Sequence, residues 1–260
     1  MSFGDELMAS GHALTEHKRS GRKVVIVTKS GKPRWDELWR GLPWIVQPGE
    51  EAGDALRLRN GPQCRPYIRY PFTRKTGCTF SGWRARDHVG AIALTKAEME
   101  RAGRVRQETG PFILIEPHVP PQSNPNKQWG WANWQALADI LRGQGRTVAQ
   151  FRLPGVPMLE RATPIETSSF REGAAVLALA EDAILPEGGM HHAAGVLRRH
   201  AVVLFGGVVD VEATGYPWHS NIVDTSEASP CGRWEPCDHC ADIWRALSPE
   251  AVAARLDRQT

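Results

Sequence analysis

The 260-residue sequence lacks the features that mark membrane proteins, secreted disulfide-rich proteins and strongly basic nucleic-acid-binding proteins. It has no run of about 18 apolar residues, so we expect no membrane insertion. Its first ten residues, MSFGDELMAS, contain neither a basic nor an apolar region, and we expect no signal peptide. Five cysteines, an odd number, argue against a disulfide framework and favour a reducing cytoplasm. A net charge of +3 is too small to indicate a nucleic-acid partner by itself.

What the sequence contains is the composition and the alternating pattern of an α/β protein. Hydrophobic residues make up 41% and charged residues 23%. The patterns predict strands at 23–28, 111–117, 146–151, 182–186 and 201–206, and helices at 5–20, 96–103, 131–143, 170–180 and 191–200, with a last helix after Ser248. Strands that alternate with helices predict βαβ crossovers and parallel sheets. Residues 41–90 have few regular patterns.

The segment LPEGGMHHAAG, residues 185–195, lies between a predicted strand and a predicted helix. A helix N-terminus attracts phosphate, and Gly188 and Gly189 would let a diphosphate approach the backbone closely. Glu187 could accept hydrogen bonds from sugar hydroxyls, and His191 or His192, the residues after Met190, could donate to phosphate. The alternative is a glycine-containing structural turn with surface histidines.

A second segment of the same kind, IEPHVPPQSNPNKQWGWANW, connects a predicted strand to the helix at 131–143. His118 follows the strand directly, and Lys127 precedes the helix, where its ammonium could pair with a phosphate. Trp129 is close by, although tryptophans at this spacing usually pack in a core. Loops after two strands of one parallel sheet can converge on one ligand, so the two segments together predict a nucleotide-diphosphate site.

These motifs, in this order, resemble glycosyltransferase family 9, the ADP-heptose:lipopolysaccharide heptosyltransferases. The segments that carry the resemblance are FGDELMASGHAL, NKQWGWANWQALADIL and LPEGGMHHAAGVLRRHAVVLFGGVVDVEATGY. The resemblance implies a GT-B fold with two Rossmann-like lobes, an acceptor-binding lobe at 1–108 and a nucleotide-sugar-binding lobe at 109–260. Only three residues precede the Gly-Asp pair, where the family has a strand, so the first lobe is expected to be trimmed.

The resemblance also implies roles for single residues. Asp5 matches the family's catalytic aspartate, a general base that would take the proton of an acceptor hydroxyl during inverting transfer from a nucleotide-diphosphate sugar. Lys127 matches the phosphate-binding lysine, and Glu187 with the residues after it matches the D-[ST]-G turn and its histidine, His192. Glu187 and Gly188 depart from that pattern, which leaves the donor sugar and base open. No D-x-D motif is present, so no metal on the diphosphate and no other cofactor are expected.

The segment at 64–88 mixes cationic and aromatic side chains and is the candidate acceptor surface. Cations contact phosphates and aromatic rings stack on bases, so the mixture predicts DNA as a partner. Short proteins of this kind resemble phage sequences, which suggests 5-hydroxymethylpyrimidine in DNA as the acceptor. The alternative acceptor is a lipopolysaccharide core. Alternatively, the chain is a non-catalytic nucleotide- or DNA-binding protein, or the segment belongs to a lobe that packs its aromatic side chains inside. The candidate cations are Arg65, Arg69, Arg74, Lys75, Arg84 and Arg86.

The cysteine-rich stretch SPCGRWEPCDHC lies near the C-terminal end. Cys231, Cys237, Cys240 and His239 could hold zinc, because three thiols and an imidazole form a usual ligand set. However, His239 lies between two of the cysteines, and no second, separated ligand pair is visible. The sequence therefore favours a packing role, with zinc as the alternative. It makes no prediction of oligomeric state.

Overall fold

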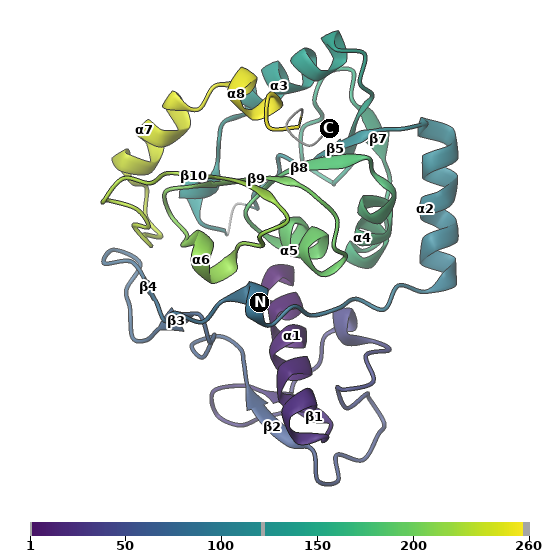
Figure 1. Cartoon of the computed structure of the whole chain (residues 1–260), viewed down its shortest axis with the longest axis vertical. Coiled ribbons are helices and arrows are strands. Elements are labelled where there is room, and N and C mark those ends of the chain that lie inside the picture. Colours follow the sequence, from purple (N-terminus) through teal and green to yellow (C-terminus); the bar gives the residue numbers. More distant parts are fainter. Residues whose placement is uncertain (1, 121–122, 257–260) are drawn as a thin grey trace.

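The centre of the molecule is a six-stranded parallel sheet (Figure 1). The computed structural model describes residues 2–120 and 123–256 of the chain. From one edge to the other the strands are β10 (Ser220–Val223), β9 (Val202–Gly206), β8 (Asp182–Pro186), β5 (Ile113–Ile115), β6 (Val148–Phe151) and β7 (Thr163–Ile165). The parallel sheet confirms the predicted α/β class.

The strand order reverses in the middle of this sheet. The chain runs from β5 outward through β6 to β7, and then returns to β8 on the other side of β5 before running outward to β9 and β10. Ligands of open parallel sheets bind at such a reversal, beyond the carboxyl ends of the strands. The two predicted ligand-binding segments follow β5 and β8, so the topology brings both to this point.

Successive residues of a strand point to opposite faces of the sheet. The strands carry apolar side chains on both faces, and helices cover both. On one face Ile113, Ile115 and Ile184 pack with α3 (Trp131–Gly143), α7 (Asp238–Ala246) and α8 (Pro249–Ala253). On the other face Leu114 and Leu185 pack with α2 (Lys96–Thr109), α4 (Phe170–Leu179) and α5 (Gly189–Val196). A short helix, α6 (Val211–Thr214), follows β9.

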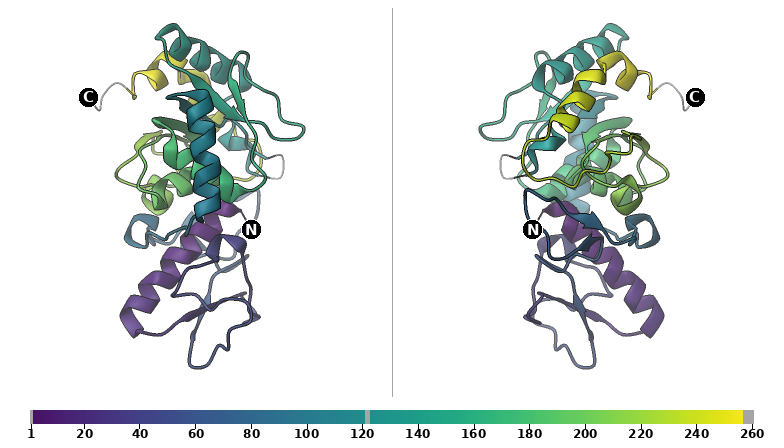
Figure 2. Two further views of the ribbon diagram at one scale, coloured as in Figure 1. Left: turned by 90° about the vertical axis from the view of Figure 1, so that its right-hand side faces the viewer. Right: turned by 90° about the vertical axis from the view of Figure 1, so that its left-hand side faces the viewer.

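The N-terminal part is smaller and has a long helix as its main element (Figure 2). Helix α1 (Phe3–Ser20) ends where Gly21 takes a left-handed conformation at φ 72°, as predicted. Strands β1 (Val24–Val27) and β2 (Leu56–Arg59) form a two-stranded parallel sheet, and β3 (Ile68–Arg69) pairs antiparallel with β4 (Thr79–Phe80). Three 3-10 turns complete the described elements: η1 (Glu37–Trp39), η2 (Ala85–Asp87) and η3 (Pro125–Lys127).

The two parts share one hydrophobic core. Leu7, Ala9 and Ala13 of α1 belong to the same buried cluster as Ala193 and Ala194 of α5. The close approach of α1 to the following segment needs a glycine, since a Cβ on Gly11 would lie 1.7 Å from the backbone oxygen of His88. The first turns of α1 therefore pack against α5 of the larger part, and Gly11 packs against the segment around His88.

Several predicted boundaries differ from those of the structure. The helix predicted at 96–103 continues to Thr109, so the lobe boundary predicted at residue 108 lies inside α2, which packs on α4 of the larger part. The helix predicted at 191–200 is α5, which begins two residues earlier and ends at Val196. It cannot continue because Arg198 has φ 54°. The boundary between the lobes stays a prediction.

Candidate donor and acceptor site

Lys127 and Glu187, 60 residues apart in the sequence, form an ion pair at the reversal of strand order. Lys127 ends η3 in the segment after β5, and Glu187 directly follows β8. The Glu187 side chain is only 5% exposed, whereas that of Lys127 is 20% exposed. The structure thus brings together the two residues that the sequence assigned to phosphate and sugar recognition. Residues 121–122 of the first segment lie outside the described residues.

The charge on Glu187 is stabilised by its neighbours. Burial disfavours the carboxylate, but the Lys127 ammonium and the nearby His192 imidazole outweigh burial and hold the pKa of Glu187 far below its usual range. Nε2 of His192 lies 3.7 Å from Oε1 of Glu187, and its Nδ1 lies 3.1 Å from the hydroxyl of Tyr216. Glu187 is therefore an anion that orients one cation and one imidazole.

Helix α5 begins next to this pair with its N-terminus open. Its N-cap is Gly188, which provides no side-chain cap, and a Cβ built on Gly188 meets nothing within 4 Å. Helix α3 likewise begins at a glycine without a side-chain cap, Gly130. By contrast α1, α2 and α4 are capped by Ser2, Thr95 and Ser169. Two helices at the strand reversal thus offer unpaired backbone N–H groups to an anion.

The neighbours of Gly188 in α5 have different environments. Gly189 lies against two aromatic residues, with a built Cβ 3.1 Å from the ring of Phe170. The terminal methyl of Met190 points to Gly173 of α4. His191 is fully buried, and burial with the nearby imidazoles of His192 and His219 holds its pKa well below the usual value. Only the backbone of Met190 thus belongs to the open turn, and His191 is a neutral core residue.

Asp5 lies in the first turn of α1, directly beside the α5 turn. A Cβ on its neighbour Gly4 would lie 2.5 Å from Cδ2 of His192 and 3.5 Å from the backbone oxygen of Gly188. The carboxylate of Asp5 is 3% exposed. Its Oδ1 accepts a hydrogen bond of 2.7 Å from Tyr67 and lies 2.8 Å from Nε of Arg65, and its Oδ2 accepts from the hydroxyl of Ser2 at 3.0 Å.

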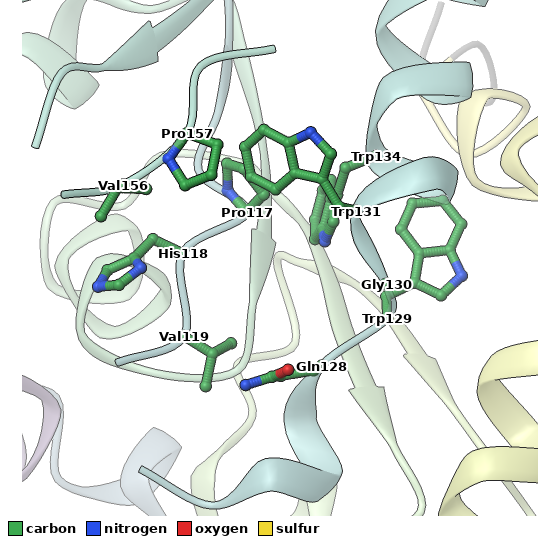
Figure 3. A pocket seen from close by; sticks show the side chains of 10 residues that line it. All are labelled: Pro117, His118, Val119, Gln128, Trp129, Gly130, Trp131, Trp134, Val156 and Pro157. Atoms are coloured by element: carbon green, nitrogen blue, oxygen red, sulfur yellow. The ribbon is translucent and has the colours of Figure 1, made fainter. Parts of the chain in front are cut away.

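A pocket of about 170 Å³ opens beside the segment after β5 (Figure 3). It is lined by His118, Trp131 and residues around them, and Trp131 is 37% exposed. Pockets that enclose a drug-sized ligand usually measure about 300–1,000 Å³. This smaller pocket suits one part of a nucleotide, such as its base. Trp129 also lines it, but its indole is 2% exposed and donates to the backbone oxygen of Leu247 at 3.0 Å. Trp129 is mainly a core residue.

Glu116, at the end of β5, is a polar residue of this sheet edge to which the sequence analysis gave no role. Burial raises its pKa to about 8, although Oε1 accepts a hydrogen bond of 3.0 Å from the backbone N–H of His118. Oε2 is buried with no hydrogen-bond partner in the described part of the chain. An acidic residue at the carboxyl end of a buried parallel strand was the signal available in the sequence.

The six candidate cations of segment 64–88 do not form one surface. Arg65 pairs with Asp5, Arg86 with Glu212, and Arg84 with Asp87. Arg69, Arg74 and Lys75 are exposed. The aromatic rings are engaged as well: Trp83 stacks on His88 with centroids 4.8 Å apart, and Phe72 stacks on Trp234 at 6.5 Å. Three cations remain for an anionic partner.

The four residues of the cysteine-rich stretch converge. One ligand atom from each of Cys231, Cys237, His239 and Cys240 lies within 4.8 Å of the others. These are the four residues that the sequence offered as possible zinc ligands, and the described part of the chain adds no second, separated ligand pair to them. Among the described residues, no helix has the length and apolar character needed to cross a membrane.

Comparison with solved structures shows where this fold occurs. A glycosyl transferase family 9 structure from Veillonella parvula has a TM-score of 0.64, with 11% identity, and covers 99% of this chain and 94% of that one. ADP-heptose lipopolysaccharide heptosyltransferase II of E. coli has a TM-score of 0.49, with 16% identity, over 65% of this chain and 53% of that one. The dodecameric iron-containing heptosyltransferase TibC of E. coli, in complex with ADP-D-β-D-heptose, has a TM-score of 0.46, with 15% identity, over 57% and 44%.

The similarity to the Veillonella structure shows the fold. The chain matches almost the full length of the Veillonella protein but only about half the length of the two E. coli enzymes. The sequence matches no model of a known protein family and no curated protein. The GT-B arrangement expected from the motifs is confirmed, and the structural neighbours are glycosyltransferases.

Proposed function

We propose that this protein is an inverting glycosyltransferase that moves a sugar from a nucleotide-diphosphate donor to an acceptor hydroxyl. The observation that carries the proposal is the Lys127–Glu187 pair beside the open N-terminus of α5, facing the turn that holds Asp5. A cation and uncapped N–H groups suit a diphosphate, and a carboxylate on the opposite side suits the removal of a proton.

The roles follow from the atoms of each group. The acceptor oxygen forms a bond to the anomeric carbon while the bond from that carbon to the phosphate oxygen breaks, and the departing diphosphate keeps the electron pair. The acceptor proton goes to Asp5. Lys127 and the N–H groups of α5 stabilise the charge that develops on the leaving group. Because both oxygens of Asp5 are engaged, the acceptor hydroxyl has to take the place of the Tyr67 or Ser2 hydroxyl.

The donor site is tested by calorimetry with ADP, UDP and GDP. We expect at least one of them to bind, and Lys127→Ala to weaken that binding by about tenfold or more, since a charge-assisted contact to phosphate contributes about 1.5–3 kcal/mol. Lys18→Ala, in an exposed position near the end of α1, is the matched control and should leave affinity unchanged. If none of the three nucleotides binds, the proposal is wrong.

The role of Asp5 separates an enzyme from a nucleotide-binding protein with the same fold. We expect Asp5→Asn to keep nucleotide affinity and to lose transfer by about a hundredfold or more, the scale of general-base catalysis. Asp54→Asn, at an exposed position, is the control. Thermal unfolding of both variants shows whether the loss reflects folding, because Asn at position 5 leaves Arg65 without its carboxylate. Unchanged transfer by folded Asp5→Asn would exclude the mechanism.

For the acceptor we propose DNA that carries 5-hydroxymethylpyrimidine, as in phage DNA within a bacterial cytoplasm. The support is the exposed set Arg69, Arg74 and Lys75 in the segment that also provides Tyr67 and Arg65 to Asp5. The base would have to leave the duplex stack to reach Asp5. DNA affinity should fall steeply with salt, and replacing the three cations by alanine should flatten that dependence.

Mass spectrometry of nucleosides decides between acceptors. Hydroxymethylated DNA is incubated with a panel of nucleotide-sugars, and a hexose- or pentose-sized gain on the base supports the DNA proposal. Transfer to a lipopolysaccharide core without any gain on DNA would instead assign the protein to heptosyltransferase-like synthesis of cell-surface glycans.

A further inference from the structure

The cysteine-rich stretch forms a four-residue cluster away from Asp5 and Glu187. Cys231 lies in the loop after β10, and Cys237, His239 and Cys240 lie at the N-cap and in the first turn of α7. Cys237 and Cys240 are buried, and with Val208 they form a small core cluster of their own. The cluster thus joins two separate segments of the chain.

The distances in this cluster suit a metal ion. Sγ of Cys231 and Sγ of Cys240 lie 3.4 Å apart, and both cysteines are free thiols. A disulfide needs a sulfur–sulfur distance of about 2.05 Å. Two thiolates on one tetrahedral zinc, each about 2.3 Å from the ion, would lie about 3.8 Å apart. The four ligand atoms, all within 4.8 Å of one another, are therefore already near the spacing that a bound ion requires.

His239 is held in the orientation of a metal ligand. Its Nε2 lies 3.3 Å from Oδ2 of Asp224 and 3.1 Å from the hydroxyl of Ser226. Its Nδ1 is buried and has no hydrogen-bond partner among the described residues. Metal-bound histidines commonly donate their second ring N–H to a carboxylate, which fixes the ring and the tautomer. Asp224 provides that carboxylate, and Nδ1 is left for the ion.

The N-terminus of α7 stabilises negative charge on the cysteine ligands. Its N-cap is Cys237, and no side chain caps the helix. Cys240 lies three residues further, in the first turn. A helix N-terminus favours thiolate over thiol, and three thiolates with a neutral imidazole are the ligands of a common structural zinc site.

We propose that Cys231, Cys237, Cys240 and His239 bind a structural Zn²⁺, which fastens the loop 231–240 between the two parts of the molecule. The ion replaces the thiol protons, which are released to solvent on binding. With four protein ligands the site is closed, so the ion has a structural role and leaves no position for substrate.

The loop connects to the donor segment on one side. Asn126 donates to the backbone oxygens of Arg233 and Glu235 at 3.0 and 2.8 Å, and its Oδ1 accepts from the N–H of Cys237 at 3.0 Å. Asn126 is buried and immediately precedes Lys127. An ion that fixes Cys237 therefore also fixes the residue next to the phosphate-binding candidate.

On its other side the loop contacts the basic segment 64–88. The N–H of Cys78 donates to the backbone oxygen of Gly232 at 3.0 Å, and the N–H of Trp234 donates to that of Arg74 at 3.1 Å. The contact is tight, because a Cβ on Gly232 would lie 2.0 Å from the backbone oxygen of Cys78. Zinc at this loop would thus hold the donor segment and the acceptor segment in fixed positions relative to each other.

Metal analysis of the unaltered protein is the first test. After purification without chelators and dialysis, we expect about one zinc per chain by mass spectrometry, in line with a four-ligand site. A mercurial that blocks thiols should release it to a colorimetric chelator. Less than about a tenth of an equivalent, with none taken up from added Zn²⁺, would overturn the proposal. An equivalent of iron in place of zinc would overturn the assignment of the ion.

Variants then locate the ion. Cobalt substitution should give the visible absorption of tetrahedral Co²⁺ with thiolate ligands, and this should disappear in Cys240→Ser but not in Cys64→Ser, a cysteine outside the cluster. Asp224→Asn should weaken metal affinity by about 10- to 100-fold. His239→Ala should weaken it as well, and His239→Cys should restore it. Cobalt spectra unchanged by Cys240→Ser would contradict the site.

A last measurement, which rests on the proposed function, links the ion to the donor site. Removal of zinc by a chelator should weaken nucleotide-diphosphate affinity by about tenfold, the scale of losing a hydrogen bond that orders Asn126. Re-addition of Zn²⁺ should restore it. Zinc content is measured without nucleotide, so the two proposals can fail separately. A protein that binds zinc but no nucleotide would refute only the proposed function. Nucleotide affinity that does not change on zinc removal would refute only the link between the ion and the donor site.

Discussion

At the scale of single residues, Glu116 is a carboxyl group that carries no charge at neutral pH. Burial raises its pKa to about 8, and one of its oxygens has no partner in the described part of the chain. Its neighbour across the sheet edge, Glu187, is equally buried but remains an anion because Lys127 lies beside it. Two glutamates that follow adjacent strands thus differ in charge because only Glu187 has Lys127 and His192 beside it.

Glu116 makes the stability of the protein depend on pH. Its folded-state pKa lies above the ordinary value of 4.5, so the unfolded chain releases this proton first as pH rises. Glu116 should then contribute a fall in the free energy of unfolding of about 1.4 kcal/mol per pH unit between about pH 4.5 and pH 8. We expect Glu116→Gln to remove this contribution, as measured by urea unfolding at several pH values, and to leave that of Glu6, whose pKa burial raises to about 7.

Glu51→Gln, at an exposed position, is the control for that series and should keep the slope of the unaltered protein. The Glu116→Gln substitution also changes the free energy of unfolding at every pH, because it places an amide where the second oxygen has no partner. This change does not depend on pH, so the slopes with pH are compared. Parallel pH curves for the unaltered protein and Glu116→Gln would show that Glu116 is ionised in the folded state.

The sequence indicated which residues of the two segments lie together, but not all of the ion pairs that the candidate residues form. Lys127, Glu187 and His192 were assigned to one site because segments after two strands of a parallel sheet can converge, and they do lie together. Arg65 was assigned to DNA by its composition, yet it pairs with Asp5. Pairing across 60 residues depends on the tertiary fold within each lobe, and local patterns do not contain that information.

At the scale of elements, the helices divide by how they begin. Side chains cap α1, α2, α4, α6 and α8, whereas α3, α5 and α7 have none among the described residues. The first two uncapped helices border the proposed diphosphate site, and the third begins in the proposed zinc site. A missing cap at a buried helix end costs stability unless a ligand takes its place.

Gly188 tests the open end of α5. Its φ of 162° is an extended conformation that other residues adopt, and a Cβ there meets nothing within 4 Å. We therefore expect Gly188→Val to fold with an unchanged thermal midpoint and to weaken nucleotide-diphosphate binding by about tenfold or more, since the side chain would occupy the space of the phosphates. Calorimetry and thermal unfolding measure the two effects.

Gly103→Val provides a matched control, because its Cβ also meets open space but lies in α2, away from the site. It should bind nucleotide normally. Normal binding by Gly188→Val would show that no ligand approaches this turn.

Elements with strong local signals were predicted, and those without them were not. The stop of α1 at Gly21 and the caps Ser169 and Ser248 are visible in the sequence, because each acts on adjacent residues. Strand β7 contains Pro164 and is only three residues long, and as an edge strand it tolerates the missing N–H. Its existence depends on pairing with β6, which is a tertiary contact.

At the scale of the whole molecule, the shared core determines how the protein unfolds. Leu7 and Ile26 of the N-terminal part belong to one buried cluster with Leu114 and Ala193 of the larger part. A two-stranded sheet such as β1–β2 is at best marginally stable alone. The N-terminal part therefore depends on the larger part for its stability.

We expect thermal unfolding to be one cooperative transition. The calorimetric enthalpy should equal the van't Hoff enthalpy, and tryptophan fluorescence should give the same midpoint as far-ultraviolet circular dichroism. Trp39 reports on the N-terminal part and Trp134 on the larger part, and both are buried. Two resolved transitions would show that the lobes are independent.

The packing of α1 on α5 also sets the order of events during protein synthesis. About 170 residues separate the end of α1 from the start of α5, so at about 5–20 residues per second the ribosome needs roughly 10–30 s to supply the partner. Until then Leu7, Ala9 and Ala13 can pack only against residues of the N-terminal part, such as Ile26 and Trp39. Helix α1 is thus synthesised well before its native contacts with α5 can form, and a nascent chain stalled before α5 would be a substrate for chaperones.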